Sequence, residues 1–341
     1  MALEQFGVMP DGTPVERVTI TGGGLSAKIL SYGAVLQDLR LDGFEKPLVL
    51  GFETLENYLT YKSHFGATAG RVANRICDGR FELDGKSYQL DINFIEKHSL
   101  HGGTHGIGTR VWTFDKIEAD KIEMSIDLAD GEMGYPGNMK IKLVYSLLAN
   151  GVLDILMTAT TDAPTLCNLA HHSYFNLEGS ASILDHELQI DSSRYTEVSS
   201  ELIPTGKLLS VEGTTLDFRA KKSIGSASKV TPIDNNFCIE ETAGSLRRVA
   251  TLSSAASGIS MDVMTTEPGL QAYDGVNIKQ GAPGLDGLVM GSHSGFCLEP
   301  QIWPDAINHE GFPSPILRPD EEYLPAHAIC VQQKLDWFDA N

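Results

Sequence analysis

The sequence has few positive charges and no long apolar run, and both absences narrow its function. Its 341 residues include 26 Lys and Arg against 45 Asp and Glu, a formal net charge of -19 at pH 7. Such a surface repels phosphate backbones, so nucleic acid and anionic membranes are poor partners, whereas neutral small molecules stay open. No apolar segment is long enough to cross a bilayer. The first twenty residues lack a basic stretch followed by an apolar run, so no signal peptide is expected.

Cysteines and common catalytic motifs are also sparse. The five cysteines are odd in number, far apart and without a C-x-x-C pair, which argues against a disulfide framework or a thiolate zinc site. We interpret them as buried thiols in a reducing cytoplasm. No P-loop occurs, and "GSHSG" does not have the spacing of a nucleophile elbow. The cysteines are Cys77, Cys167, Cys238, Cys297 and Cys330.

Helical periodicity is nearly missing, and short alternating runs between turn signals take its place. "RFELDGKSYQL" predicts a hairpin around Asp84-Gly85, and "VYSLLANGVLDILMTAT" predicts another around Asn150-Gly151. "TLENYLTYK" predicts one short helix capped by Thr54. No repeat or linker divides the chain, so residues 1–341 are expected to form one domain. The class indicated is all-β, a large antiparallel β-sandwich.

Two clusters combine basic or histidine side chains with glycine. "AGRVANRICDGRF" holds Arg71, Asn74 and Arg75, which read either as a solvated loop or as donors to ligand hydroxyls. "EKHSLHGGTHGIG" holds three histidines: His98, His101 and His105. Their spacing is not that of a helical zinc motif, and a loop gives no fixed face for ligands, so a hydrogen-bonding histidine is favoured over a metal site. No metal is expected.

The segment "NLAHHSYFNLEG" places two histidines side by side. In an extended segment His171 and His172 point to opposite faces, so at most one reaches a given pocket. Tyr174 lies two residues after His172 and shares its face. A histidine beside a tyrosine suits a pocket with apolar walls and a few polar groups, such as one that binds a sugar ring. A satisfied core histidine is the alternative for either residue alone.

The segment "SGFCLEPQIWPDAIN" places Glu299 after the short apolar strand "GFCL". A carboxylate at the end of a buried strand is costly unless it is paired or used. Desolvation there raises the pKa of the carboxyl group, so that it can act as a general base near neutral pH. The alternative is a salt bridge that closes the strand. Asp234 before an apolar strand in "PIDNNFCIE" and Gln271 in "GLQAYDG" are weaker candidates.

Taken in order, these segments resemble the aldose 1-epimerases, the galactose mutarotases. "GRVANRI", "LHGG", "NLAHHSYFNLEG", "PIDNNFCI", "GLQAY" and "GFCLEPQIWPDAINH" run along most of the chain. The resemblance implies a galactose mutarotase-like supersandwich that interconverts the α and β anomers of free hexoses, such as glucose and galactose, without a cofactor. By motif position His172 matches the proton donor and Glu299 the proton acceptor. The matched substrate-binding positions are Asn74, Arg75, His101, Tyr174, Asp234 and Gln271.

The resemblance predicts general acid–base ring opening. Glu299 would take the C1 hydroxyl proton while His172 protonates the ring oxygen, and the open aldehyde would reclose on its other face. A bell-shaped pH profile is expected, with loss at low pH from Glu299 protonation and at high pH from His172 deprotonation.

The chain departs from the family's usual pattern at a few positions beside the motifs, and these departures affect substrate preference. They are Ala170, His171, Asn235 and Asp274. Three alternatives remain: a non-catalytic sugar-binding homologue, a glycoside hydrolase or lyase with Asp234 as second carboxylate, and a hexose-6-phosphate epimerase, which would need a basic cluster. The preferred aldose is not specified, and monomer and homodimer both fit.

Overall fold

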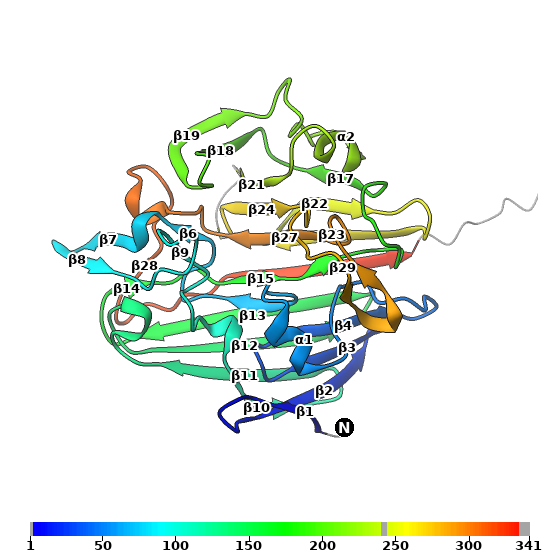
Figure 1. The fold of residues 1–341 in the computed structure, drawn as a ribbon, viewed down its shortest axis with the longest axis horizontal. Coiled ribbons are helices and arrows are strands. Elements are labelled where there is room, and N and C mark those ends of the chain that lie inside the picture. Colours follow the sequence, from blue (N-terminus) through cyan, green and yellow to red (C-terminus); the bar gives the residue numbers. More distant parts are fainter. Residues whose placement is uncertain (1–2, 240–243, 334–341) are drawn as a thin grey trace, which may run out of the picture.

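The computed structural model describes residues 3–239 and 244–333, whose main regular elements are antiparallel strands (Figure 1). Helices in these parts are short, and none has the length and apolarity needed to span a membrane. The α-helices are α1 (Leu55–Thr60) and α2 (Gly225–Ser228). The 3-10 turns are η1 (Cys77–Gly79), η2 (Ile107–Thr109), η3 (Glu132–Gly134), η4 (Leu285–Gly287) and η5 (Ala306–Asn308). The all-β prediction is therefore confirmed.

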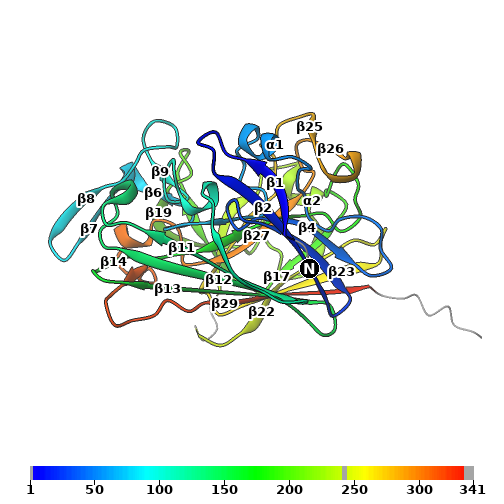
Figure 2. The same cartoon turned by 90° about the horizontal axis from the view of Figure 1, so that it is seen from below.

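A nine-stranded antiparallel sheet forms one outer layer of the molecule (Figure 2). Helix α1 and the hairpin of β25 (Ala282–Pro283) and β26 (Val289–Met290) lie on the opposite side. In spatial order the nine strands are β10 (Thr113–Ile117), β11 (Lys121–Leu128), β12 (Met139–Leu148), β13 (Val152–Thr161), β29 (Ala326–Gln333), β23 (Ile259–Thr265), β22 (Arg247–Ser253), β17 (Glu187–Ile190) and β20 (Lys222–Ser223).

A six-stranded antiparallel sheet packs inside it. Its strands in order are β16 (Tyr174–Phe175), β27 (Phe296–Gln301), β24 (Gly269–Tyr273), β21 (Asp234–Cys238), β18 (Arg194–Val198) and β19 (Pro204–Ser210). All six residues of β27 are buried. A strand covered on both faces cannot show the polar alternation of a half-exposed one.

The remaining strands form one four-stranded sheet and several pairs. The four-stranded sheet is β1 (Glu4–Val8), β2 (Pro14–Gly22), β3 (Leu25–Leu30) and β4 (Leu36–Leu41). The other pairs are β5 (Ala67–Ala69) with β15 (Ala170–His172), β6 (Arg75–Ile76) with β9 (Ser99–Leu100), β7 (Arg80–Leu83) with β8 (Lys86–Gln89), and β14 (Thr165–Leu166) with β28 (Ile316–Leu317).

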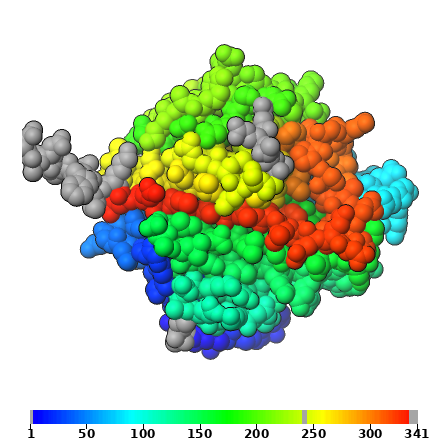
Figure 3. All heavy atoms as spheres, turned by 180° about the vertical axis from the view of Figure 1, so that it is seen from behind, coloured from blue at the N-terminus to red at the C-terminus, as the bar shows by residue number. Residues whose placement is uncertain are grey.

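Strand β29 joins the two halves of the large sheet. It pairs with β13 on one side and with β23 on the other, and in Figure 3 it appears as the red band between green and yellow segments. The inward residues of β12 alternate with more exposed ones, and the same holds for β13 and β23. The largest apolar cluster runs from Val18 to Val331 and fills the space between the sheets.

The local predictions are largely confirmed. Asp84-Gly85 and Asn150-Gly151 both have positive φ at the tips of their hairpins, as a two-residue turn of the I′ type requires. The Thr54 side chain accepts a hydrogen bond from the Asn57 N–H and caps α1. One placement is wrong: Glu299 lies inside β27 and does not follow it, because Pro300 and Gln301 continue the strand.

Candidate functional site

Strand β15 lies between the two large sheets, and its two histidines face different ones. His171 contacts the Tyr145 hydroxyl on β12, at 3.2 Å from Nδ1, and the Ser173 hydroxyl, at 2.7 Å from Nε2. Because the Tyr145 O–H donates to the Ala34 carbonyl, His171 Nδ1 donates to Tyr145 and Nε2 accepts from Ser173. His171 is thus a satisfied core histidine.

His172 faces the six-stranded sheet instead. Its Nε2 lies 3.6 Å from Glu299 Oε1 on β27, and its Nδ1 lies 3.6 Å from Cys297 Sγ on the same strand. Cys297 and Glu299 are two residues apart, so both point to one face of β27. The two proton-transfer candidates are therefore in contact although they lie far apart in the sequence, so the fold alone brings them together.

Strand register then places the other acidic and amide candidates beside Glu299. Gln271 on β24 is the direct cross-strand partner of Glu299 on β27. Gln271 Nε2 donates to Asp234 Oδ1 on β21 at 2.5 Å. Asp234 lies two residues before Asn236, the direct partner of Gln271 on β21, so one face of three adjacent strands presents the side chains of Glu299, Gln271 and Asp234.

Arg75 reaches this face from β6, which belongs to a different pair of strands. Its Nη2 lies 3.1 Å from Asp234 Oδ2, and its Nη1 lies 3.3 Å from Asn74 Oδ1. The guanidinium also lies 4.8 Å from the centre of the Phe94 ring. Asn74, Arg75, Asp234 and Gln271 thus form one hydrogen-bonded chain, in which charge-assisted contacts fix the side chains.

Arg71, from the same motif, has a different role. Its guanidinium donates to the carbonyls of Pro136 and Gly137 at 2.9 and 3.0 Å, and it lies over the Tyr135 ring. These contacts hold the loop between β11 and β12. Of the two arginines in "GRVANR", only Arg75 therefore lies on the site.

His101 is locked to Asn74 by two hydrogen bonds. The Asn74 N–H donates to His101 Nδ1 at 3.2 Å, and the His101 N–H donates to the Asn74 carbonyl at 3.1 Å. Both residues have positive φ, 66° for Asn74 and 50° for His101. A neutral imidazole that accepts at Nδ1 carries its proton on Nε2, so Nε2 is the donor that His101 offers to a ligand. Its ring centre lies 5.3 Å from that of His172.

Tyr174 lies on the same side as His172, as the sequence predicts. Their ring centres are 5.2 Å apart, and the Tyr174 ring also contacts Phe65 at 4.7 Å. The Tyr174 hydroxyl donates to the Ser63 carbonyl at 3.0 Å. Because its O–H is already committed to the backbone, Tyr174 forms part of the wall of the site and holds the loop that carries Ser63.

The site is buried at its base and opens toward its rim. The exposed fraction of the side chain is 3% for Glu299, 8% for His172, 12% for Arg75 and 18% for Asp234. Burial raises the pKa of Glu299 well above its usual 4.5; the charge of Asp234 raises it further, and that of Arg75 lowers it. Burial lowers the pKa of His172 to about 3, with a smaller contribution from His64.

These shifts reverse the proton order expected from the sequence. Because the pKa of Glu299 lies above that of His172, a single proton shared by the pair rests on Glu299 in the unliganded protein. Burial also lowers the pKa of His101 well below 6.5. The histidines are therefore neutral at pH 7, and the two limbs of a pH profile exchange their assignments. Local sequence cannot show this, since the desolvation comes from packing between distant strands.

Sequence reasoning missed two buried amides beside Glu299. Asn236 lies across from Gln271 on β21, and Gln301 lies two residues beyond Glu299 on β27. Within residues 3–239 and 244–333, neither amide group has a hydrogen-bond partner, and the same holds for Glu299 Oε2. Gln301 continues the buried strand after Glu299, whereas Asn236 follows two polar residues and no local pattern marks it.

Metal-ligating atoms come together at two places in the described part of the chain. One group is Cys77, Asp78 and His98, and the other is His172, Cys297 and Glu299. His98 Nδ1 accepts from the Asp78 N–H, and its Nε2 lies 3.3 Å from Glu201, so both of its nitrogens are engaged. The histidine loop itself supplies only His98 to either group.

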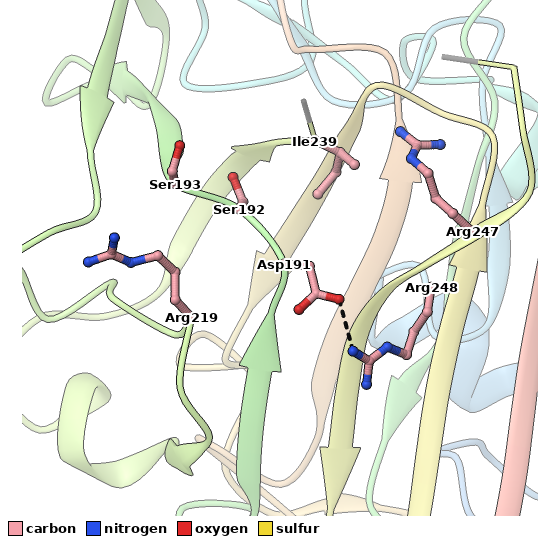
Figure 4. A pocket seen from close by; sticks show the side chains of 7 residues that line it. All are labelled: Asp191, Ser192, Ser193, Arg219, Ile239, Arg247 and Arg248. Carbon is pink, nitrogen blue, oxygen red and sulfur yellow. Dashed lines mark hydrogen bonds and ion pairs between the residues drawn. The ribbon is translucent and has the colours of Figure 1, made fainter. Parts of the chain in front are cut away.

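A polar hollow of about 440 Å³ lies elsewhere, beside the ends of β17 and β22 (Figure 4). Arg248 contacts Asp191 at 3.2 Å, and Arg219 donates to Asp217 through two nitrogens. Arg247 donates to the carbonyls of Thr265 and Glu267. These arginines are engaged by the protein itself, and no histidine lines the hollow. The catalytic candidates lie away from it.

Comparisons with known proteins point to one family. The sequence model of the family described as aldose 1-epimerase matches residues 16–325. Human galactose mutarotase is 41% identical over 329 residues, which cover 93% of this chain and 94% of that protein. Aldose 1-epimerase of Escherichia coli strain K12 is 33% identical and covers 95% of this chain and 97% of its own. The crystal structure of an aldose epimerase homologue from C. elegans superposes with a TM-score of 0.88 at 30% identity, covering 94% and 99% of the two chains.

Proposed function

This chain belongs to the aldose 1-epimerase family and interconverts the anomers of aldoses, and we propose that it does so on free hexoses with His172 and Glu299 as its proton-transfer groups. The observation that carries the proposal is the 3.6 Å contact between His172 Nε2 and Glu299 Oε1, two buried groups with opposite pKa shifts. Groups whose environments push their pKa values apart are natural partners in acid–base chemistry.

The closeness of the two groups suits a hemiacetal. Its hydroxyl oxygen O1 and its ring oxygen O5 are bonded to the same carbon, C1, so an acid and a base that serve both oxygens must be neighbours. Glycoside hydrolysis instead uses two carboxylates about 5–10 Å apart. Asp234, the alternative second carboxylate, already accepts from Gln271 and Arg75 through its two oxygens. These contacts support a sugar-holding role for Asp234 over a hydrolytic one.

Ring opening uses the form of the pair with its proton on His172. Glu299 takes the proton from O1 while His172 gives its proton to O5, the C1–O5 bond breaks, and an open aldehyde forms. This step leaves Glu299 protonated and His172 neutral. That is the form which burial favours in the unliganded protein, so the site stabilises the pair as it stands beside the open sugar.

Reclosure runs the same transfers in the other direction. After rotation about C1–C2, Glu299 returns a proton to O1 as neutral His172 takes one from the O5 hydroxyl. The ring then closes on the opposite face of the carbonyl. Each positioned acid or base contributes about 10²–10⁴-fold in rate. The two transfers move protons only, so the proposal includes no cofactor.

The remaining polar groups hold the sugar. Arg75 and His101 Nε2–H can donate to hydroxyl oxygens, and Asp234 can accept from hydroxyl groups. Their mutual hydrogen bonds keep them in place before the sugar arrives, which lowers the cost of ordering them. The matched positions proposed to contact substrate are Asn74, Arg75, His101, Tyr174, Asp234 and Gln271.

Polarimetry on freshly dissolved α-glucose and α-galactose tests the function. The purified protein should bring each optical rotation to its equilibrium value faster than buffer does. Aryl glycosides incubated in parallel should release no phenol. Release of phenol without faster mutarotation would support the hydrolase alternative, and sugar binding without either activity would support a non-catalytic homologue.

We also propose that the chain acts as one domain in the cytoplasm, as a monomer or homodimer. The apolar cluster from Val18 to Val331 supports a single folding unit. Cys167 and Cys297 are buried unpaired thiols, which suits a reducing compartment. Size-exclusion chromatography with light scattering tests the oligomeric state.

A further inference from the structure

A third histidine lies against the two site histidines. The ring centre of His64 is 4.6 Å from that of His101 and 5.8 Å from that of His172, to which it is nearly parallel at 28°. His101 and His172 are 5.3 Å apart, so the three rings form a triangle. His64 comes from the loop between α1 and β5, and none of the motifs in the sequence contains it.

The backbone holds His64 in place. Its carbonyl accepts from the Ala67 N–H at 3.0 Å, and the preceding carbonyl, that of Ser63, accepts from the Tyr174 hydroxyl at 3.0 Å. The φ of His64 is 54°, in the left-handed region that residues other than glycine seldom adopt, although Asn, Asp and His do so more often than the rest. Such conformations persist where the surroundings fix them, often at ligand sites.

The ring nitrogens of His64 are available to a ligand. Among residues 3–239 and 244–333, neither ring nitrogen of His64 forms a hydrogen bond. The two nitrogens are also not among the fully buried polar atoms that lack a partner. The two nitrogens are therefore not fully enclosed, although the side chain as a whole is half-buried. His64 also lines a cavity of about 440 Å³ together with Tyr32 and Phe65, but the site residues His172 and Glu299 do not line that cavity.

The protonation state suits recognition of a hydroxyl group. Burial lowers the pKa of His64 to about 4, so the ring is neutral at pH 7. One nitrogen then donates and the other accepts, as a hydroxyl group does. If His64 served packing alone, a phenyl ring of similar shape would replace it without changing which sugar binds best.

We propose that His64 is a specificity-determining residue that hydrogen-bonds a hydroxyl group of the bound hexose away from the anomeric carbon. The geometry that supports this is the triangle with His101 and His172, together with two ring nitrogens that form no hydrogen bond within the described residues and are not fully enclosed. The inference rests on the proposed function, because it needs a sugar held between His172 and Glu299. O1 and O5 are served by those two groups, which leaves the other hydroxyl groups for His64.

Kinetics on a panel of deoxy sugars test the inference. His64→Phe keeps an aromatic ring and removes both nitrogens, and kcat and KM are measured by polarimetry on glucose and on 3-, 4- and 6-deoxyglucose. We expect His64→Phe to lower kcat/KM for glucose about tenfold, the value of one neutral hydrogen bond. For the one deoxy sugar that lacks the partner hydroxyl, the wild type and the variant should have the same kcat/KM.

Two further variants make the result decisive. His105→Phe changes an exposed histidine that lines the same cavity, and it should leave kcat/KM for every sugar unchanged. His64→Gln retains a donor and an acceptor and should restore part of the preference for the full sugar. An equal loss on all four sugars, or full activity in His64→Phe, would overturn the inference. A wild type that fails to speed mutarotation would instead refute the proposed function, so the two failures are distinguishable.

Discussion

The two faces of β15 belong to different regions of the molecule. On one face His171 contacts Tyr145 of the nine-stranded sheet, and every polar atom of that contact has a partner. On the other face His172 contacts Glu299 of the six-stranded sheet, where Glu299 Oε2 has no partner among the described residues. Adjacent histidines thus separate a contact whose polar atoms are all paired from one in which a buried carboxylate oxygen is left without a partner.

The two regions therefore differ in how their buried side chains contribute to stability. A buried polar group without a partner costs about 1–3 kcal/mol of stability. The inner face carries several such groups, in Glu299, Asn236 and Gln301. The outer sheet offsets that cost with apolar side chains along β12, β13 and β23. Polar atoms left unsatisfied inside a protein are expected at places that bind a ligand, since a bound sugar can supply their partners.

Glu299→Gln should have the largest effect on the inner face. The amide keeps the shape of the carboxyl group but cannot exchange protons, so kcat should fall by about 10²–10⁴-fold, as polarimetry can measure. The midpoint of thermal unfolding should stay the same or rise.

A second buried carboxylate gives the matched control. Burial raises the pKa of Glu267 to about 7, and its Oε1 accepts from the Tyr323 hydroxyl outside the site. Glu267→Gln keeps an acceptor for Tyr323 and should retain the wild-type kcat. Near-normal activity in Glu299→Gln would end the assignment of Glu299 as a proton-transfer group.

Substitutions at the two neighbouring histidines should separate chemistry from stability. His172→Asn should lower kcat by about 10²-fold or more, because it removes one proton-transfer group. His171→Leu should keep kcat within a few fold but lower the free energy of unfolding by about 1–3 kcal/mol, because the Ser173 hydroxyl loses its partner. Urea denaturation and polarimetry on both variants check this. If both substitutions changed kcat and the free energy of unfolding to the same extent, the two faces of β15 would not differ as described.

Leu143→Ala tests the outer sheet by itself. Leu143 is fully buried on β12, and the truncation should lower the free energy of unfolding by about 2–5 kcal/mol. Since no candidate site residue lies on β12, kcat at 20 °C should match the wild type, provided that circular dichroism shows the variant to be folded. A loss of kcat larger than the loss of folded protein would show that the two sheets are coupled.

The smallest effect is expected from mild acid. The pair is active when it holds one proton, between the pKa of His172 near 3 and that of Glu299, which lies well above 4.5. As pH falls below the pKa of Glu299, activity should stay nearly constant, and the low-pH limb should appear only as His172 takes up the second proton. Initial rates in the pH range that retains the folded state measure this. An activity loss centred at the ordinary pKa of glutamate would restore the assignment expected from the sequence.

Local patterns predicted the elements better than they predicted the site's chemistry. The Asp-Gly and Asn-Gly turns, the Thr54 cap and the opposite faces of His171 and His172 depend on neighbours in the sequence, so the sequence shows them. The proton order of His172 and Glu299 depends on burial between strands far apart in the chain, and no local pattern reports it. His64 was missed for the same reason, since only the fold brings it to His101.

The insertion of β29 between β13 and β23 also has a consequence for biosynthesis. Until residues 326–333 have left the ribosome, the edges of β13 and β23 that pair with β29 in the finished protein have no strand beside them. Unpaired strand edges can pair with strands of other molecules, and pairing between residues far apart in the sequence slows folding. We therefore expect the protein to be prone to self-association until β29 has paired with β13 and β23.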